Sequence, residues 1–383
     1  MNIKMSSLSI RLKFTGQEFE VCAKIVFDKP RREIDFILNQ NLMLTKFASE
    51  DNNLSLELLQ TVQPEFRSTS NQWKICCEEE ISVVYLEYSG TVEFWYNVLA
   101  KDVKALSWYS VWFPQELPFE LAGDEVIIED GADLFVVKGE FDGGTGTWRY
   151  GGNGFDPFNI VAYQKSTLTI VANENLNIYT VDAEIANQAE KIDKVYQDIL
   201  NYFNGELFVK KAINTLDIAT VYPAIKQGGG YQRTGLLFTD KLGDSDEEIS
   251  WLIAHETAHN WCTGADVNSF EDWLNEGTAD WSALLYALSV NNQKLFDFII
   301  NMRKSYADFS QPLKPIDGSR CPSVHANSTM LLYQIYEKYG SQYVEQIIRM
   351  FAELKVKTTE NLLNKISNEI SDDIASDLLK GLR

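Results

Sequence analysis

Two histidines and a glutamate occur in the order His255-Glu256-Thr257-Ala258-His259. Residues four apart lie on one face of an α-helix, so both imidazoles can reach one metal ion. Glu256 is displaced about 100° around the helix. It would lie near the ion without binding it, where a base for an attacking water is needed. The spacing predicts a catalytic Zn²⁺ site in which His255 and His259 are ligands and Glu256 is the general base.

A third ligand is expected, because zinc in a catalytic site is typically held by three protein side chains and one water. Glu276 is the best candidate, since it begins a second predicted helix in the run Asp272–Asp280. Asp280 follows one turn later and can accept the second N–H of a ligand histidine, which would fix its tautomer. Asn275, beside Glu276, is the other predicted supporting residue. Cys262 is interpreted as a packing residue.

The first of these helices has a recognisable start. Ser245 and Glu248 have the spacing of a capping box, in which each side chain satisfies the backbone donor of the other residue. The helix is expected to continue through His259 to about Gly264. The remainder of the chain, from Ser245 to Arg383, is predicted to be mostly helical.

The first half of the sequence has short strand-like segments broken by turn residues. Glu125–Glu129 and Leu134–Val137 flank Asp130-Gly131, a pattern typical of a β-hairpin. Several such units at short spacing favour a β-sandwich. The predicted fold class is α+β, with a β-sandwich domain over residues 1–175 and a mainly helical catalytic domain over residues 176–383.

Composition excludes some classes of partner. The formal net charge of −21 argues against nucleic acid or an anionic membrane surface, which require clustered Lys and Arg. No apolar run reaches the roughly 18 residues of a membrane-spanning helix, and the N-terminus does not have the pattern of a signal peptide. The five cysteines are odd in number and have no CxxC spacing, which favours a reducing compartment. A cytoplasmic protein is expected; the oligomeric state is not indicated.

The runs HETAHNW and WLNEG resemble the gluzincin metallopeptidases, most closely the aminopeptidase N family, which includes leukotriene hydrolase. The connection from His259 to Glu276 has sixteen residues and is slightly shorter than the family pattern. The resemblance covers roughly residues 175–340. It implies a thermolysin-like catalytic domain, a zinc cofactor and a peptide substrate. Because the chain ends at Arg383, it also predicts that the family's long C-terminal helical domain is missing and that the cleft is more open.

Two features depart from the family. His325 falls where the family has a tyrosine that hydrogen-bonds the tetrahedral oxyanion, so His325 is predicted to perform that role. The run that aligns with the family's amine-binding segment has Gln232 in place of its anchoring glutamate. A neutral amide binds an ammonium group more weakly than a carboxylate does. The predicted substrate-binding residues, which could also bind an extended peptide by strand addition, are Gly229, Gly230, Tyr231, Gln232 and Arg233.

The predicted activity is zinc-dependent hydrolysis of peptide bonds, with a preference for an aminopeptidase. Gln232 and the missing C-terminal domain support an endopeptidase instead. A catalytically silent protein that binds zinc or a peptide is the alternative outside the enzyme class, although retention of Glu256 argues against it. Hydrolysis of a non-peptide substrate such as an epoxide has precedent in the family, but no residue of this sequence indicates it.

Overall fold

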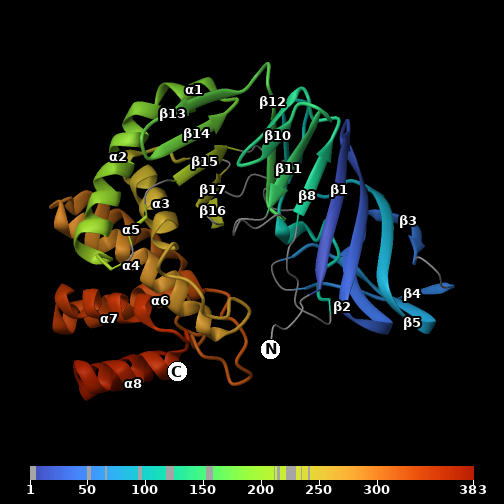
Figure 1. Ribbon diagram of the computed structural model, residues 1–383. Helices are drawn as coiled ribbons and strands as arrows, with labels where there is room; N and C mark the ends of the chain where they lie inside the picture. The colour runs from blue at the N-terminus through green and yellow to red at the C-terminus, as the bar shows by residue number, and fades with distance from the viewer. Residues whose placement is uncertain are drawn as a thin grey trace.

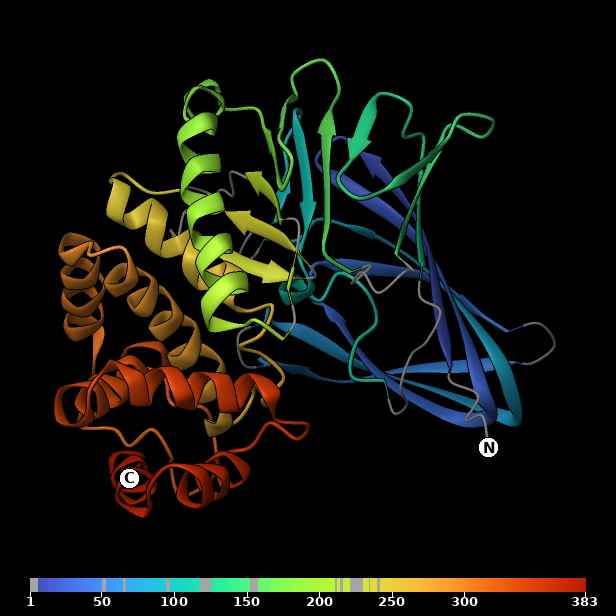
Figure 2. The ribbon, with the colours of Figure 1, turned by 60° about the vertical axis from the view of Figure 1, so that its left-hand side comes forward.

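The structure is a computed structural model (Figure 1). It describes residues 6–49, 53–64, 67–93, 97–117, 125–151, 158–210, 212–213, 216–220, 230–233, 235–239 and 242–383. Figures 1 and 2 show the N-terminal strands on one side of the molecule and the helices of the C-terminal half on the other. The α+β class predicted from the sequence is confirmed.

The largest sheet contains the N-terminal strands in the order β10-β11-β8-β1-β2-β5-β3, and β4 also pairs with β5. Apolar residues alternate along β1, where Leu8, Ile10 and Leu12 are buried, because only one face of this sheet meets the core. Its strands are β1 (Ser7–Thr15), β2 (Glu18–Asn39), β3 (Leu42–Ala48), β4 (Leu54–Val62), β5 (Ser70–Gly90), β8 (Glu125–Glu129), β10 (Glu140–Asp142) and β11 (Thr147–Gly151).

A four-stranded sheet, in the order β6-β7-β12-β9, packs against the largest sheet. Its strands are β6 (Val98–Leu99), β7 (Val103–Leu106), β9 (Leu134–Val136) and β12 (Ile160–Gln164). Ile160 and Ala162 face the core shared with the largest sheet, while Val161 and Tyr163 belong to a second core on the opposite face. Because both faces are covered, β12 is apolar nearly throughout.

The hairpin predicted around Asp130-Gly131 is wrong. A turn does occur there, since Asp130 has a φ of 51°. However, β8 pairs with β1 and β11, whereas β9 pairs with β12 in the other sheet. The chain therefore passes from one sheet to the other at this turn. Strand pairing depends on non-local contacts, which a local turn signal does not determine.

A five-stranded sheet, in the order β13-β14-β15-β17-β16, lies between the four-stranded sheet and the helices. The three central strands are parallel, and the edge strands β13 and β16 are antiparallel to their neighbours. The strands are β13 (Thr169–Ala172), β14 (Leu176–Thr180), β15 (Leu216–Thr220), β16 (Gly230–Arg233) and β17 (Leu236–Thr239). Ala219 and Phe238 face the four-stranded sheet, whereas Ile218 and Leu237 face the helices.

The helices share one core with the five-stranded sheet. From residue 245 the described chain is mostly helical, as predicted. The α-helices are α1 (Ala183–Asn187), α2 (Ala189–Tyr202), α3 (Asp246–Ala258), α4 (Trp273–Ser289), α5 (Gln293–Tyr306), α6 (Val324–Tyr339), α7 (Ser341–Glu353), α8 (Thr359–Glu369) and α9 (Asp372–Gly381). Short irregular helices are η1 (Trp108–Ser110), η2 (Phe203–Leu207) and η3 (Phe270–Asp272). Among the described residues, no helix combines the length and apolar character needed to cross a bilayer.

The division of the chain between residues 175 and 176 stays a prediction. Strand β13 precedes that position, yet it pairs with β14 in the sheet that the helices cover. The last strand of the four-stranded sheet, β12, ends at Gln164. The change from one sheet system to the next therefore occurs between β12 and β13.

Candidate metal centre

Helix α3 carries the His-Glu-x-x-His run and begins as a capped helix. The Ser245 side chain accepts a hydrogen bond from the Glu248 N–H at 3.1 Å. The Glu248 carboxylate accepts from the N–H of Asp244 at 2.8 Å, one residue earlier than the capping box predicts. The helix ends at Ala258, so the predicted continuation to Gly264 is wrong. His259 occupies the C-cap position, where its N–H still bonds to the Glu256 carbonyl and its φ and ψ remain helical.

Helix α4 brings Glu276 opposite the two histidines from its first turn. A close crossing of α4 and α6 occurs at Gly277, where an added Cβ would lie only 2.9 Å from the Cβ of Ser328. Glycine at this position therefore allows the two helices to approach. Since His325 lies one turn before Ser328 on α6, the same crossing places His325 beside Glu276.

Three potential ligand atoms lie within 4.8 Å of one another, one each from His255, His259 and Glu276. The two Nε2 atoms are 3.2 Å apart. Glu276 Oε2 is 3.4 Å from His255 Nε2 and 3.7 Å from His259 Nε2. Zinc–nitrogen distances near 2.05 Å in a tetrahedral site separate neighbouring ligands by about 3.3 Å. The spacing of this group fits zinc.

The carboxylate oxygen that faces this group lies close to three imidazoles but accepts no well-aligned hydrogen bond from the described residues. Glu276 Oε2 is buried, and no described residue donates a well-aligned hydrogen bond to it. Burial disfavours the charged form, but the nearby imidazoles of His325, His259 and His255 hold the pKa of Glu276 well below its usual range. A buried anionic oxygen without a partner is costly unless a cation neutralises it. This orphaned oxygen is a second indication that the three residues fit a metal ion.

Asp280 is completely buried and fixes the first histidine. Its Oδ1 is 2.8 Å from His255 Nδ1, which leaves Nε2 of His255 facing Glu276 and His259. Burial disfavours the imidazolium, but the Asp280 carboxylate outweighs it and raises the pKa of His255 to about 10. A metal ion must therefore displace a proton from this imidazole when it binds.

Three residues that sequence reasoning did not identify complete the surroundings of Asp280. The guanidinium of Arg303 donates to both carboxylate oxygens, from Nε at 2.6 Å and from Nη2 at 3.0 Å. Trp251 Nε1 donates at 3.0 Å and the Thr329 hydroxyl at 2.6 Å. Although burial opposes the charged form, Arg303 and His255 hold the pKa of Asp280 well below its usual range.

A sequence signal for Arg303 did exist. The buried residues of α5 are Leu295, Phe296, Ile299, Ile300 and Arg303. Arg303 is thus a cation on the apolar face of an amphipathic helix, which indicates a buried anionic partner. Periodicity alone would not have shown that this partner is Asp280.

The second histidine is held differently, by the loop that follows α3. His259 Nδ1 is 3.0 Å from the carbonyl oxygen of Cys262, whose own side chain is buried. Asn275 secures the same loop: its amide pairs with both the N–H and the carbonyl of Ala265, each at 3.1 Å. Asn275 therefore positions the connection between the two metal-binding helices.

Glu256 lies between the two histidines in sequence and is only 4% exposed. Among the described residues, no hydrogen bond or ion pair engages its carboxylate. The negative charge of Glu256 contributes to the raised pKa of His255, which shows that Glu256 lies close to the ligand group. No described residue therefore holds this carboxylate in a fixed pairing beside the ligands.

His325 lies in the first turn of α6. Its Nδ1 is 2.9 Å from Glu276 Oε2, and its side chain is 42% exposed. On the other side of the ring, Nε2 is 3.3 Å from Nη2 of Arg320, another residue that sequence reasoning missed. All three histidines therefore meet at Glu276. The predicted oxyanion role of His325 stays a prediction.

The predicted substrate-binding run forms the edge strand β16, next to α3. Gly229 lies outside the described residues, and Arg233 is described only through its backbone. Gly230 begins β16, where an added Cβ would meet the Phe238 carbonyl at 2.7 Å. Gln232 points towards α3 and donates to the Asn260 side chain at 3.2 Å.

Tyr231 faces the opposite way from Gln232. Its ring stacks on Phe238 with centroids 4.7 Å apart, and its hydroxyl donates to Asn159 at 3.0 Å. The side chain belongs to the core between the two sheets. Any contribution of Tyr231 to substrate binding is therefore limited to its backbone.

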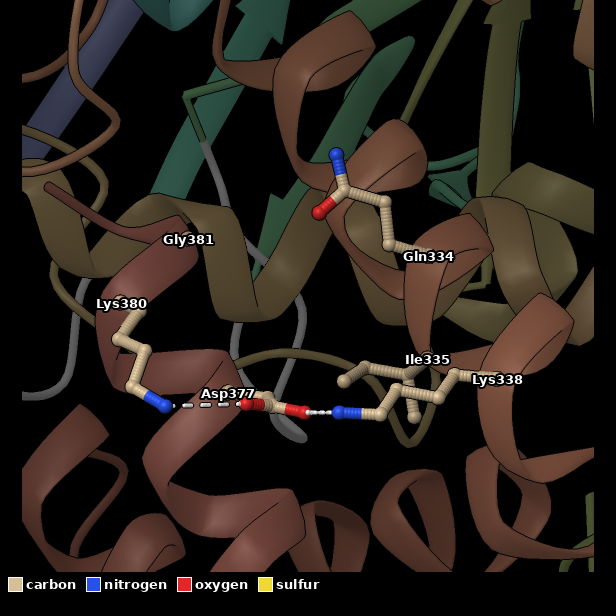
Figure 3. A pocket seen from close by; sticks show the side chains of 6 residues that line it. All are labelled: Gln334, Ile335, Lys338, Asp377, Lys380 and Gly381. Atoms are coloured by element: carbon tan, nitrogen blue, oxygen red, sulfur yellow. Dashed lines mark hydrogen bonds and ion pairs between the residues drawn. The ribbon is translucent and has the colours of Figure 1, made fainter.

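A separate pocket lies between α6 and α9 (Figure 3). Asp377 is paired there with Lys338 at 2.5 Å and with Lys380 at 3.3 Å. Asp377 thus balances only one of the two lysine charges that line this pocket. None of the predicted site residues contributes to it.

Comparison with known proteins gives a fold but no sequence match. No protein-family model and no curated protein matches the chain. Leukotriene A4 hydrolase from Saccharomyces cerevisiae has a similar structure, with a TM-score of 0.66 and 15% identity, over 99% of this chain and 67% of the yeast protein. The M1 zinc metallopeptidase from Deinococcus radiodurans has a TM-score of 0.60 and 13% identity, over 100% of this chain and 94% of that protein.

A variant of the same Deinococcus radiodurans protein, bound to a Tyr-Ser-Ala substrate, matches with a TM-score of 0.60 and 13% identity. This match covers 100% of the present chain and 94% of the Deinococcus radiodurans chain. At such low identity the likeness establishes the fold and leaves the activity to the site. The chain has the fold of the gluzincin metallopeptidases related to aminopeptidase N and leukotriene hydrolase, which confirms the resemblance seen in its sequence.

Proposed function

We propose that this protein is a zinc-dependent peptidase. The observation that carries the proposal is the group formed by His255 Nε2, His259 Nε2 and Glu276 Oε2. Glu256 follows His255 in the sequence, and its buried carboxylate has no hydrogen-bonded or ionic partner among the described residues. A protein that only binds zinc needs the first three residues but not the fourth. M1 zinc metallopeptidases of the same fold support this assignment.

Each residue of the site has a separate role in peptide hydrolysis. Zinc, when held by His255, His259 and Glu276, supplies Lewis acidity that polarises the scissile carbonyl and activates water. Glu256 accepts a proton from the attacking water and then delivers it to the departing amine nitrogen. Asp280 keeps the proton of His255 on Nδ1, so that Nε2 remains a ligand atom.

Removal of the metal should abolish hydrolysis. We expect about one zinc per chain, chelator-sensitive cleavage of peptides, and recovery of activity when zinc is added back to the metal-free protein. Metal analysis combined with a peptide-cleavage assay measures both quantities. Zinc bound at full occupancy without hydrolysis of any peptide would show instead that the protein is a binding protein.

The substrate class that we propose is a peptide with a free amino terminus. Gln232 lies on β16 beside Asn260, the residue that follows His259. Its position next to the metal-binding helix is suited to contact with the end of a bound peptide. A two-domain M1 zinc metallopeptidase of the same fold is bound to L-tryptophan, and the Deinococcus radiodurans protein is bound to a Tyr-Ser-Ala substrate. A cytoplasmic location is also part of this proposal and rests on the cysteine pattern.

The neutral amide of Gln232 should make the preference for a free amino terminus weak. Gln232→Glu is expected to increase that preference about tenfold, because a charge-assisted hydrogen bond is stronger than a neutral one by roughly 1–1.5 kcal/mol. Matched peptides with free and acetylated amino termini, compared by kcat/KM, measure it. Equal cleavage of both peptides by the wild-type and by Gln232→Glu would show that the protein is an endopeptidase.

A further inference from the structure

Arg320 is held rigidly at the edge of the metal centre. An isolated β-bridge joins Ser319 to Ser269, and the N–H of Phe270 donates to the Gly318 carbonyl at 3.1 Å. The Arg320 side chain is 9% exposed, and its Nε donates to Asp272 Oδ2 at 2.7 Å. The backbone and the ion pair together fix the direction in which the guanidinium points.

This guanidinium also contacts His325, where Arg320 Nη2 lies 3.3 Å from Nε2 of the imidazole. Arginine is always charged and can only donate hydrogen bonds, so Nε2 of His325 must be the acceptor. A neutral imidazole has one donor and one acceptor nitrogen. In its neutral form His325 therefore carries its proton on Nδ1, the nitrogen nearer to Glu276.

One acceptor close to this proton is Glu276 Oε2, the oxygen that would face a bound metal ion. Although Nδ1 is 2.9 Å from Glu276 Oε2, no aligned hydrogen bond reaches that oxygen from the described residues. The imidazole is 42% exposed, whereas the side chain of Arg320 is only 9% exposed. The N–H of Nδ1 is thus available beside the metal ligands, where negative charge develops on the substrate oxygen during hydrolysis.

We propose that Arg320 is a positioning residue that holds His325 in the tautomer with its proton on Nδ1, and that this N–H is the donor to the substrate oxyanion. The proposal rests on the peptidase function proposed above. Arg320 itself is not proposed to contact the substrate. Its effect on the reaction passes entirely through His325.

The tautomer can be observed directly, because the chain contains only three histidines. Long-range ¹H–¹⁵N correlation spectra of the zinc-loaded protein, taken well above the usual histidine pKa of about 6.5, distinguish a proton on Nδ1 from one on Nε2. His325→Ala identifies the signals of His325. We expect Nδ1–H in the wild-type and an added population of Nε2–H in Arg320→Met. Wild-type His325 protonated at Nε2, or an unchanged tautomer in Arg320→Met, would overturn the proposal.

Kinetics of the same proteins give a second, independent readout. Arg320→Met should lower kcat about 10- to 100-fold with little change in KM, the usual range for loss of a supporting partner. Arg320→Lys should restore part of the loss, because lysine also only donates. In the His325→Ala background, Arg320→Met should cause no further loss of kcat. An equal loss in both backgrounds would mean that Arg320 acts independently of His325.

The two proposals fail in different ways. If no peptide is hydrolysed by the wild-type protein, the peptidase function fails, whereas the spectra still decide whether Arg320 sets the tautomer. If peptides are hydrolysed but the spectra or the double variant contradict the coupling, only the role of Arg320 is lost.

Discussion

Glu256→Gln should lower the kcat of peptide hydrolysis by about 10²- to 10⁴-fold while zinc binding is retained. The glutamine side chain has nearly the same shape, but its neutral amide cannot accept the proton of the attacking water. Because Glu256 is 4% exposed and has no hydrogen-bonded or ionic partner among the described residues, its replacement breaks no ion pair there. The loss should therefore appear in kcat and not in folding.

Glu247→Gln is the matched control, since it makes the same chemical change on the first turn of the same helix α3. We expect its kcat to remain close to the wild-type value. Steady-state kinetics together with zinc analysis of each variant give the comparison. Full activity in Glu256→Gln, with zinc bound, would remove the proposed mechanism.

Among the substitutions proposed for this protein, Asp280→Asn should cause the largest decrease in the free energy of unfolding. This carboxylate is fully buried and accepts two hydrogen bonds from Arg303, and the substitution leaves the buried guanidinium without a compensating charge. Breaking such a pair by changing one partner typically costs about 3–5 kcal/mol. The affinity for zinc should also fall by about 10- to 100-fold, since the neutral amide is a weaker acceptor for His255 Nδ1 than the carboxylate that orients it.

Denaturant unfolding of the metal-free chain measures the loss of stability separately from the loss of zinc affinity, which a competition assay with a chelator gives. Asp377→Asn is the control, because Asp377 pairs with exposed lysines on α6 and α9 and its loss should change little. If Asp280→Asn lowers the free energy of unfolding no more than Asp377→Asn does, the hydrogen-bond network assigned to Asp280 is contradicted.

The pH dependence of this stability follows from the sign of the shift. The pKa of Asp280 is depressed in the folded chain, relative to an ordinary value of about 3.9. The stabilising contribution is therefore fully present above that value and is lost as the pH falls towards the folded pKa. Wild-type and Asp280→Asn should differ in unfolding free energy at neutral pH and converge in strong acid.

Local periodicity was sufficient for the part of the site that lies on one helix. His255 and His259 are four residues apart, so helical backbone places both side chains on one face, and the structure has their Nε2 atoms 3.2 Å apart. Glu276 and Asp280 have the same one-turn relation on α4. The α+β class also follows from local patterns, because strand and helix periods change along the chain.

Only the tertiary structure decided which elements meet. Asp280 accepts hydrogen bonds from side chains of α3, α5 and α6, and its partner Arg303 lies on a different helix. The close crossing at Gly277 places His325 and Arg320 beside Glu276, and the turn at Asp130 leads from one sheet to another instead of closing a hairpin. The physical reason is common to these cases. Helical spacing is a property of a single segment, whereas buried charge pairing, helix crossing and strand pairing depend on surfaces contributed by distant parts of the chain.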